Sequence, residues 1–178
     1  DSQIFKNNNT NIGIIYRNYN AKKRENELYK IAKACKKNRY QLFVSNDIKL
    51  AIKVKAEGFY IPSFNKNKSY KNLEKTKIMI LGSAHNQKEI TQKISQNCTA
   101  IFLSPVFFVE KSKQFLGLHK FNYLSQNNNI NIFALGGISR NNIGKLKLLK
   151  TKGFGGIRLF KKKSAFFQRP IFIKNIFF

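Results

Sequence analysis

Apolar and polar stretches alternate along this chain with two different periods. Seven short apolar runs have the composition of strands that are buried on both faces, and a polar or amphipathic segment follows each of them. The runs are 11–16, 41–44, 59–63, 77–82, 99–107, 131–137 and 155–160. Strands that recur every roughly 15 to 30 residues, with helices or loops between them, indicate βα units and a parallel sheet.

Four of the intervening segments carry apolar residues at helical spacing, which predicts helices with one buried face. The first helix is expected over 22–38, and the second begins at an Asn-Asp cap at 46 and ends at Gly58. The predicted stripes are Leu28, Ile31, Ala32 and Cys35; Ile48, Ala51 and Ile52; Ile90 and Ile94; and Ile143, Leu146 and Leu149.

Two α/β architectures fit this pattern, an open doubly wound sheet and a (β/α)8 barrel, and periodicity alone does not separate them. Seven strands, in a chain that begins without Met, favour a single TIM-type barrel domain over 1–178 whose first strand lies upstream. The tail 161–178 is apolar and basic and is interrupted by Pro170. We expect Ile171 to Ile173 to add a strand or to cover a seam of the barrel.

Charge narrows the partners that the chain can attract. It has 34 Lys and Arg against 8 Asp and Glu, a net charge of +26, which favours phosphorylated small molecules or polyanions. The lysines are spread over all the predicted helices, so nucleic acid is not the expected partner. Cys35 and Cys98 lack metal-ligand spacing and fit a reducing cytoplasm. The sequence has no uninterrupted apolar stretch of about 18 residues, so we expect no membrane span.

The carboxyl ends of the strands are where a barrel of this type carries its chemistry. Gly136-Gly137 follows a strand and precedes a helix, so its backbone N–H groups can approach an anion, with a second glycine segment around Gly156 completing a phosphate cradle. The alternative is that the pair only permits a tight turn. His85, also after a strand, is either a proton shuttle or a capping residue.

Taken in order, the strand ends read RNYN, FVSND, AEGFYIPS, ILGSAHN, IFLSPVF, SK, ALGGIS and GFGGI. Over residues 13 to 160 this series resembles the thiamine phosphate synthase and thiazole tautomerase (TenI) superfamily. The resemblance implies a (β/α)8 barrel that joins hydroxymethylpyrimidine diphosphate to thiazole phosphate and releases pyrophosphate with the help of Mg²⁺. Members often form dimers, which makes a homodimer a partner to consider.

The resemblance also implies roles for single residues. Arg17 and Lys113 fall where the family binds pyrophosphate, and Ser83 falls where it orients the pyrimidine. Ser45 and Asn46 belong to a substrate-binding motif. Gly136, Gly137 and Gly156 are expected to cradle the thiazole phosphate. The residues expected to carry the reaction are Arg17, Ser83 and His85.

Several positions depart from the family pattern. Ile15 and Tyr19 stand where a glutamine and a lysine are usual, and Asn46 and Asn65 stand where two aspartates bind the metal. Replacing two carboxylates by amides removes two charges from the shell of a hard cation, so weak or absent Mg²⁺ binding is expected. Pro105 replaces the acid–base histidine of the tautomerase branch.

The function that these residues favour is a divergent synthase-like transferase. Two alternatives stay open at this point. One is a TenI-like thiazole isomerase with His85 as its acid–base residue, and the other is a non-catalytic barrel that binds a phosphorylated ligand.

Overall fold

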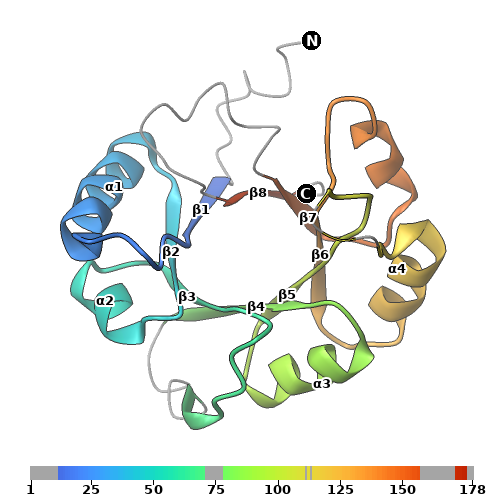
Figure 1. Cartoon of the computed structure of the whole chain (residues 1–178), viewed down its shortest axis with the longest axis horizontal. Helices are drawn as coiled ribbons and strands as arrows, with labels where there is room; N and C mark the ends of the chain where they lie inside the picture. Colours follow the sequence, from blue (N-terminus) through green and yellow to red (C-terminus); the bar gives the residue numbers. More distant parts are fainter. Residues whose placement is uncertain (1–11, 71–77, 111, 113, 157–170, 176–178) are drawn as a thin grey trace.

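The strands of the chain form a closed barrel with helices on its outer side (Figure 1). The computed structural model describes residues 12–70, 78–110, 112, 114–156 and 171–175. The strands follow one another around the barrel in chain order. They are β1 (Ile12–Tyr16), β2 (Gln41–Ser45), β3 (Gly58–Ile61), β4 (Met79–Ala84), β5 (Ala100–Leu103), β6 (Asn131–Leu135), β7 (Gly153–Gly156) and β8 (Ile171–Asn175).

Strands β1 to β7 pair in parallel, as the sequence pattern predicts. Strand β8 lies between β7 and β1 and runs antiparallel to both, with Ile14 opposite Phe172 and Gly155 opposite Ile173. The prediction that the tail adds a strand is therefore confirmed. A first strand from upstream is not confirmed, because β8 fills the gap between β1 and β7 and makes one strand of this TIM-like barrel antiparallel.

The helices lie outside the ring of strands (Figure 1). They are α1 (Arg24–Asn38), α2 (Ile48–Lys53), α3 (Gln87–Ser95), α4 (Gly117–Gln126) and the 3₁₀ helix η3 (Ile143–Leu148). Helix α2 is shorter than the predicted 46–58, because the chain turns into the left-handed region at Lys55, where φ is 52°. After β6 the predicted helix is a 3₁₀ segment.

Side chains at the helix starts explain where α2 and α3 begin. The Asp47 carboxylate accepts a hydrogen bond from the Leu50 amide at 3.0 Å, and the Asn86 side chain accepts one from the Glu89 amide at 3.0 Å. Each satisfies a backbone donor that the first helical turn leaves without a partner. The Asn-Asp cap predicted for the second helix is thus confirmed at Asp47.

The period of two along the strands separates two apolar cores. The interior of the barrel is filled by Ile15, Phe43, Tyr60, Leu81, Ala100 and Phe102. The alternate positions face the helices and form a larger cluster, which includes Ile14, Val44, Phe59, Ile101 and Phe121. The sequence of a strand with both faces buried is a continuous apolar run, and for this reason the strands could be recognised in the sequence.

Two stripe positions were predicted wrongly. Ile52 and Ile94 are 54% and 42% exposed, whereas the neighbouring Lys93 is fully buried. On α3 the reason is that three hydrogen-bond acceptors surround the ammonium group of Lys93. The buried face of the helix therefore includes Lys93 and not Ile94. Among the other predicted residues, Ala32, Ile48 and Ile143 are partly buried, and the rest, including Leu28, Ile31 and Ile90, are buried as expected.

Candidate functional site at the barrel mouth

The inner face of the barrel changes from apolar to polar at the carboxyl ends of the strands. Ser45 follows Phe43 by two residues in β2, and Ser83 follows Leu81 by two in β4, so both serines continue the inward-facing rows. Ser45 is fully buried and Ser83 is 6% exposed. The strands therefore bring two sequence-predicted site residues to the mouth of the barrel, above its apolar filling.

Arg17 lies over the same interior, directly after β1. Its guanidinium carbon is 5.7 Å from the centre of the Tyr60 ring. The Tyr60 hydroxyl is buried and has no hydrogen-bond partner in the part of the chain that the structure describes. Burial raises the pKa of Tyr60, and the nearby charge of Arg17 opposes that rise. The Arg17 guanidinium thus lies at the carboxyl end of β1, over the ring of a fully buried tyrosine.

A second arginine, Arg24 at the start of α1, ties the β1 and β2 ends together. One guanidinium nitrogen donates to the Ser45 carbonyl at 2.7 Å and another to the Asp47 carboxylate at 3.1 Å. The guanidinium carbon also lies 5.6 Å and 5.7 Å from the ring centres of Tyr16 and Tyr19. Sequence reasoning missed Arg24, because it sits in a charged run that predicts only a solvated helix face.

Tyr19 adds a further contact between these strand ends. Its hydroxyl is 2.7 Å from the Ser45 hydroxyl, and its ring meets Phe64 edge-on with the centroids 6.2 Å apart. The position where the family resemblance implies a lysine is therefore occupied by an aromatic side chain that orders Ser45. Nearby, the Tyr16 hydroxyl donates to the Glu27 carboxylate at 2.9 Å. The pKa of Tyr16 is raised, mainly by burial and to a smaller extent by this carboxylate.

The two asparagines at the expected metal positions contact each other. The Asn65 amide nitrogen donates to the Asn46 amide oxygen at 2.6 Å and to the Tyr70 hydroxyl at 3.1 Å. The Asn65 amide oxygen accepts from the Asn67 backbone N–H at 2.8 Å. Asn46 itself adopts a φ of 59°, a left-handed conformation that asparagine tolerates better than most residues.

This donor set fits Mg²⁺ poorly. The two amide oxygens carry no charge and already accept hydrogen bonds, and the adjacent Asp47 carboxylate caps α2 and pairs with Arg24. Across the described ranges, no three His, Cys, Asp or Glu side chains gather closely enough to hold a metal ion. Arg17 contributes a fixed positive charge at this mouth.

The glycine pair after β6 meets a loop of the same chain. Gly136 and Gly137 have φ of 89° and 72°, and a Cβ added to them would lie 2.8 Å from the Pro105 Cα and 2.5 Å from the Phe107 carbonyl oxygen. The Phe107 amide also donates to the Gly136 carbonyl at 3.1 Å. These contacts explain both glycines by turn geometry and close packing. Phosphate binding by their amides stays a prediction.

The remaining predicted residues are spread around the site. His85 is exposed, and its Nδ1 and its backbone N–H lie 2.8 Å and 2.9 Å from one Glu89 carboxylate oxygen at the start of α3. Gly156 is buried in β7 opposite Phe172 of β8. Lys113 lies outside the described residues. Arg17, Ser45 and Ser83 thus form a group at the carboxyl ends of β1, β2 and β4, whereas His85 is exposed and contacts Glu89.

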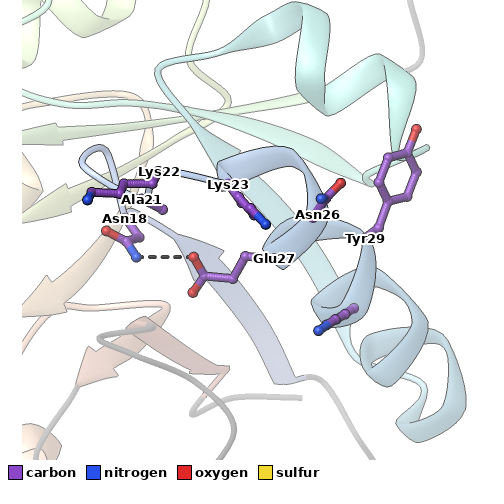
Figure 2. A pocket seen from close by; sticks show the side chains of 8 residues that line it. Asn18, Ala21, Lys22, Lys23, Asn26, Glu27 and Tyr29 are labelled. Carbon is purple, nitrogen blue, oxygen red and sulfur yellow. Dashed lines mark hydrogen bonds between the residues drawn. The ribbon is translucent and has the colours of Figure 1, made fainter.

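A cleft of about 870 Å³ opens beside this mouth, along the start of α1 (Figure 2). Three lysines and one glutamate line it, and the Asn18 side chain donates to that glutamate at 3.1 Å. Its lining residues are Asn18, Ala21, Lys22, Lys23, Asn26, Glu27, Tyr29 and Lys30. The cleft shares no residue with the Arg17, Ser45 and Ser83 group, so it adjoins the candidate site without forming it.

Within the described residues, no helix is long and apolar enough to cross a membrane.

In sequence, this chain resembles thiamine phosphate synthases. A sequence model of the thiamine monophosphate synthase family matches residues 9–159. The thiamine-phosphate synthase of Prochlorococcus marinus subsp. pastoris is 33% identical over 124 residues, which cover 68% of this chain and 35% of that protein. The putative thiamine-phosphate synthase 2 of Aquifex aeolicus is 27% identical, and the match covers 77% of both chains.

A solved structure agrees in fold. The thiamine phosphate pyrophosphorylase from Pyrococcus furiosus superposes with a TM-score of 0.67 at 19% identity, over 80% of this chain and 70% of that one. The chain spans only about a third of the length of the Prochlorococcus relatives that it matches. The family match nevertheless extends through the strands β1 to β7 that carry the site. The chain therefore belongs to the thiamine monophosphate synthase family.

Proposed function

We propose that this protein is a thiamine phosphate synthase-like transferase in thiamine biosynthesis. It would join hydroxymethylpyrimidine diphosphate to thiazole phosphate, breaking the bond between the pyrimidine methylene and pyrophosphate. The observation that carries the proposal is the group formed by Arg17, Ser45 and Ser83 at the mouth of the barrel, in a chain of this family. A cytoplasmic location and a homodimer stay predictions.

Each residue of the group has a part in this proposal. The Arg17 guanidinium, aimed over the barrel interior, binds the pyrophosphate and neutralises the charge that develops on it as it leaves. Ser83 offers a hydroxyl to the pyrimidine from the inner face of β4. Gly136, Gly137 and Gly156 hold the thiazole phosphate, and Lys113 assists Arg17.

Positive charge fixed in the protein takes the place of most of the metal's contribution. Departure of pyrophosphate requires cations near its oxygens, and the amide pair formed by Asn46 and Asn65 offers no anionic ligand to Mg²⁺. We therefore propose that the metal binds weakly and that Arg17 carries the larger share of the charge stabilisation.

The same amide pair favours a second candidate, a barrel that binds the phosphorylated ligand without turnover. For a TenI-like isomerase, His85 would have to reach the ligand from the rim, where it is held by Glu89. The test below separates these functions, because only the transferase releases pyrophosphate.

The experiment is a coupled assay of pyrophosphate release from hydroxymethylpyrimidine diphosphate and thiazole phosphate, with and without Mg²⁺. Changing Arg17 to Ala removes a charge-assisted contact that strengthens in the transition state, so kcat should fall about 100-fold. The matched control is Arg39→Ala, which removes an exposed arginine just after the last residue of α1. That variant should keep the activity of the unmodified protein.

Three other results would contradict the proposal in different ways. Equal turnover by the Arg17→Ala and Arg39→Ala variants would remove Arg17 from the site. Turnover of a thiazole phosphate without pyrophosphate release would favour the isomerase. Absence of turnover together with calorimetric binding of thiazole phosphate would favour the non-catalytic barrel.

A further inference from the structure

The side chain of Lys93 on α3 is fully buried, and its hydrogen bonds within the described part of the chain go to uncharged groups. Its ammonium nitrogen lies 2.9 Å from the Pro62 carbonyl oxygen, 2.8 Å from the Asn65 carbonyl oxygen and 2.8 Å from the Gln96 side-chain oxygen. An ammonium has three N–H donors, so these acceptors satisfy it completely. Two of the three belong to the loop that follows β3.

Gln96, at the end of the same helix, is also fully buried and completes the arrangement. While its oxygen accepts from Lys93, its nitrogen donates to the Asn65 carbonyl at 3.1 Å and to the Asn67 carbonyl at 2.7 Å. Two buried side chains thus hold three backbone carbonyls of the loop. We call this set of contacts from Lys93 and Gln96 the loop clamp.

The loop clamp acts on the segment that carries Asn65 into the candidate site. The backbone of Asn65 is bound by the clamp from below, and its side chain donates to Asn46 at the end of β2. Both sides of the residue are therefore fixed by hydrogen bonds. The clamp determines where residues 62–67 stand relative to the carboxyl end of β2.

Stability alone is a poor explanation for this lysine. Burial disfavours its charged form and lowers the pKa of Lys93, so the three hydrogen bonds have to offset the cost of removing the ammonium from water. An apolar side chain of similar length would fill the same space without that cost. What an apolar side chain could not do is donate to two loop carbonyls from one point.

We propose that Lys93 and Gln96 are positioning residues, which fix residues 62–67 after β3, and with them Asn65, at the site by a buried ammonium and an amide instead of by a metal ion. The proposal rests on the proposed function, because it treats this loop as a wall of the pyrophosphate site. Two consequences follow. Residues 62–67 are ordered in the free protein, and binding of pyrophosphate does not depend on Mg²⁺.

The first test needs no ligand and uses backbone hydrogen exchange in the full chain. In a Lys93→Met variant the amides of Asn65 and Asn67 should exchange about tenfold faster or more, while the amides of α3 and β4 keep their rates. The control is Lys88→Met, an exposed lysine on the same helix, which should leave the loop unchanged. Unchanged loop exchange in Lys93→Met, or an equal increase throughout the protein, would overturn the positioning role.

A second variant keeps the test valid if Lys93→Met fails to fold. Gln96→Glu keeps an oxygen for the ammonium and loses the nitrogen that donates to the Asn65 and Asn67 carbonyls. It should free the Asn67 end of the loop first. If exchange at both amides stays at the level of the unmodified protein in this variant, the clamp does not hold the loop.

The second test is calorimetric titration with inorganic pyrophosphate, in EDTA and in Mg²⁺. We expect the unmodified protein to bind with the same affinity, within about twofold, in both, and Lys93→Met to bind about tenfold more weakly. Binding only in Mg²⁺ would overturn the metal-free positioning. No binding in either would overturn the proposed function, while the exchange experiment would still decide whether Lys93 positions the loop.

Discussion

Gly137 at the end of β6 offers a quantitative test of what the glycine pair does. Changing it to Ala adds a single methyl group at a residue whose φ is 72°. The added Cβ would lie 2.5 Å from the Phe107 carbonyl oxygen and 2.6 Å from the Phe108 carbonyl oxygen. Both are backbone atoms, so they cannot move aside as the end of a flexible side chain would.

The expected decrease in the free energy of unfolding has two parts. The left-handed conformation costs a residue with a Cβ about 1–2 kcal/mol, and forcing a methyl group into a filled space costs about 1–3 kcal/mol. The lower backbone entropy of Ala in the unfolded chain offsets about 0.4–1 kcal/mol of this. The variant should therefore lose about 3 kcal/mol of unfolding free energy, which for a chain of this size lowers Tm by about 6–12 °C.

Urea denaturation followed by circular dichroism measures this loss. The matched control is Gly144→Ala in η3, where the added Cβ meets no atom within 4 Å. There Ala should leave the stability unchanged or raise it slightly. If the Gly137→Ala and Gly144→Ala variants unfold at the same urea concentration, the turn does not need a glycine at 137. Phosphate binding by the Gly137 amide would then be the better explanation for this glycine.

Three further outcomes follow from particular contacts. Thr151→Val should lower the free energy of unfolding, measured by urea denaturation, by about 1–3 kcal/mol. The buried Thr151 hydroxyl accepts a hydrogen bond from the Ala134 amide at 3.1 Å, and valine leaves that donor unpaired. An unchanged free energy of unfolding would mean that the β6–β7 contact tolerates the loss of this hydrogen bond. Asp47→Ala should destabilise by about 1–2 kcal/mol, whereas Asp47→Asn, which keeps a capping oxygen, should lose less; equal losses would assign the effect to the ion pair with Arg24 instead of the cap. Burial raises the pKa of Cys98 from 9.0 to about 12. The unfolded thiol therefore loses its proton first, and stability should fall as the pH rises from 9 toward 12; Cys98→Ala should flatten that decline in denaturation curves measured across this pH range, and an unchanged slope would contradict it.

The strands were the most predictable part of the fold. Most of β1 to β7 are buried on both faces, and β6 has one buried and one partly buried face, so their apolar runs stand out from the polar segments beside them. The ends were less predictable, as at 99–107, where only Ala100–Leu103 is strand. Beyond it, the Val106 amide donates to the Leu135 carbonyl, and this loop packs against the next strand end.

Helix faces were predictable only where the buried residues are apolar. On α3 the exposed Ile94 and the buried Lys93 reverse the usual order, because the Lys93 ammonium donates hydrogen bonds to backbone carbonyls of the loop after β3. Helix α4 was missed, although Phe121 and Leu124 are three residues apart and both buried. That spacing was a usable signal.

For the candidate site, the family motifs located Arg17, Ser45 and Ser83 correctly at strand ends, and inward placement of the two serines follows from the period of two. Arg24 could not be found in this way. Its role depends on where the turn after β1 places it, opposite the Ser45 carbonyl, and a pattern of residue types does not encode that distance.

Strand β8 has a consequence for how the barrel folds. It pairs with both β1 and β7, so the ring of backbone hydrogen bonds is complete only when the segment Ile171–Asn175 is in place. Until then β1 and β7 each have one unpaired edge, and unpaired strand edges can pair with other chains. Strands β1 and β8 are the two most distant strands of the barrel in sequence, and contacts between distant segments form slowly. Aggregation during refolding should therefore depend strongly on protein concentration, because the barrel closes only at its slowest contact.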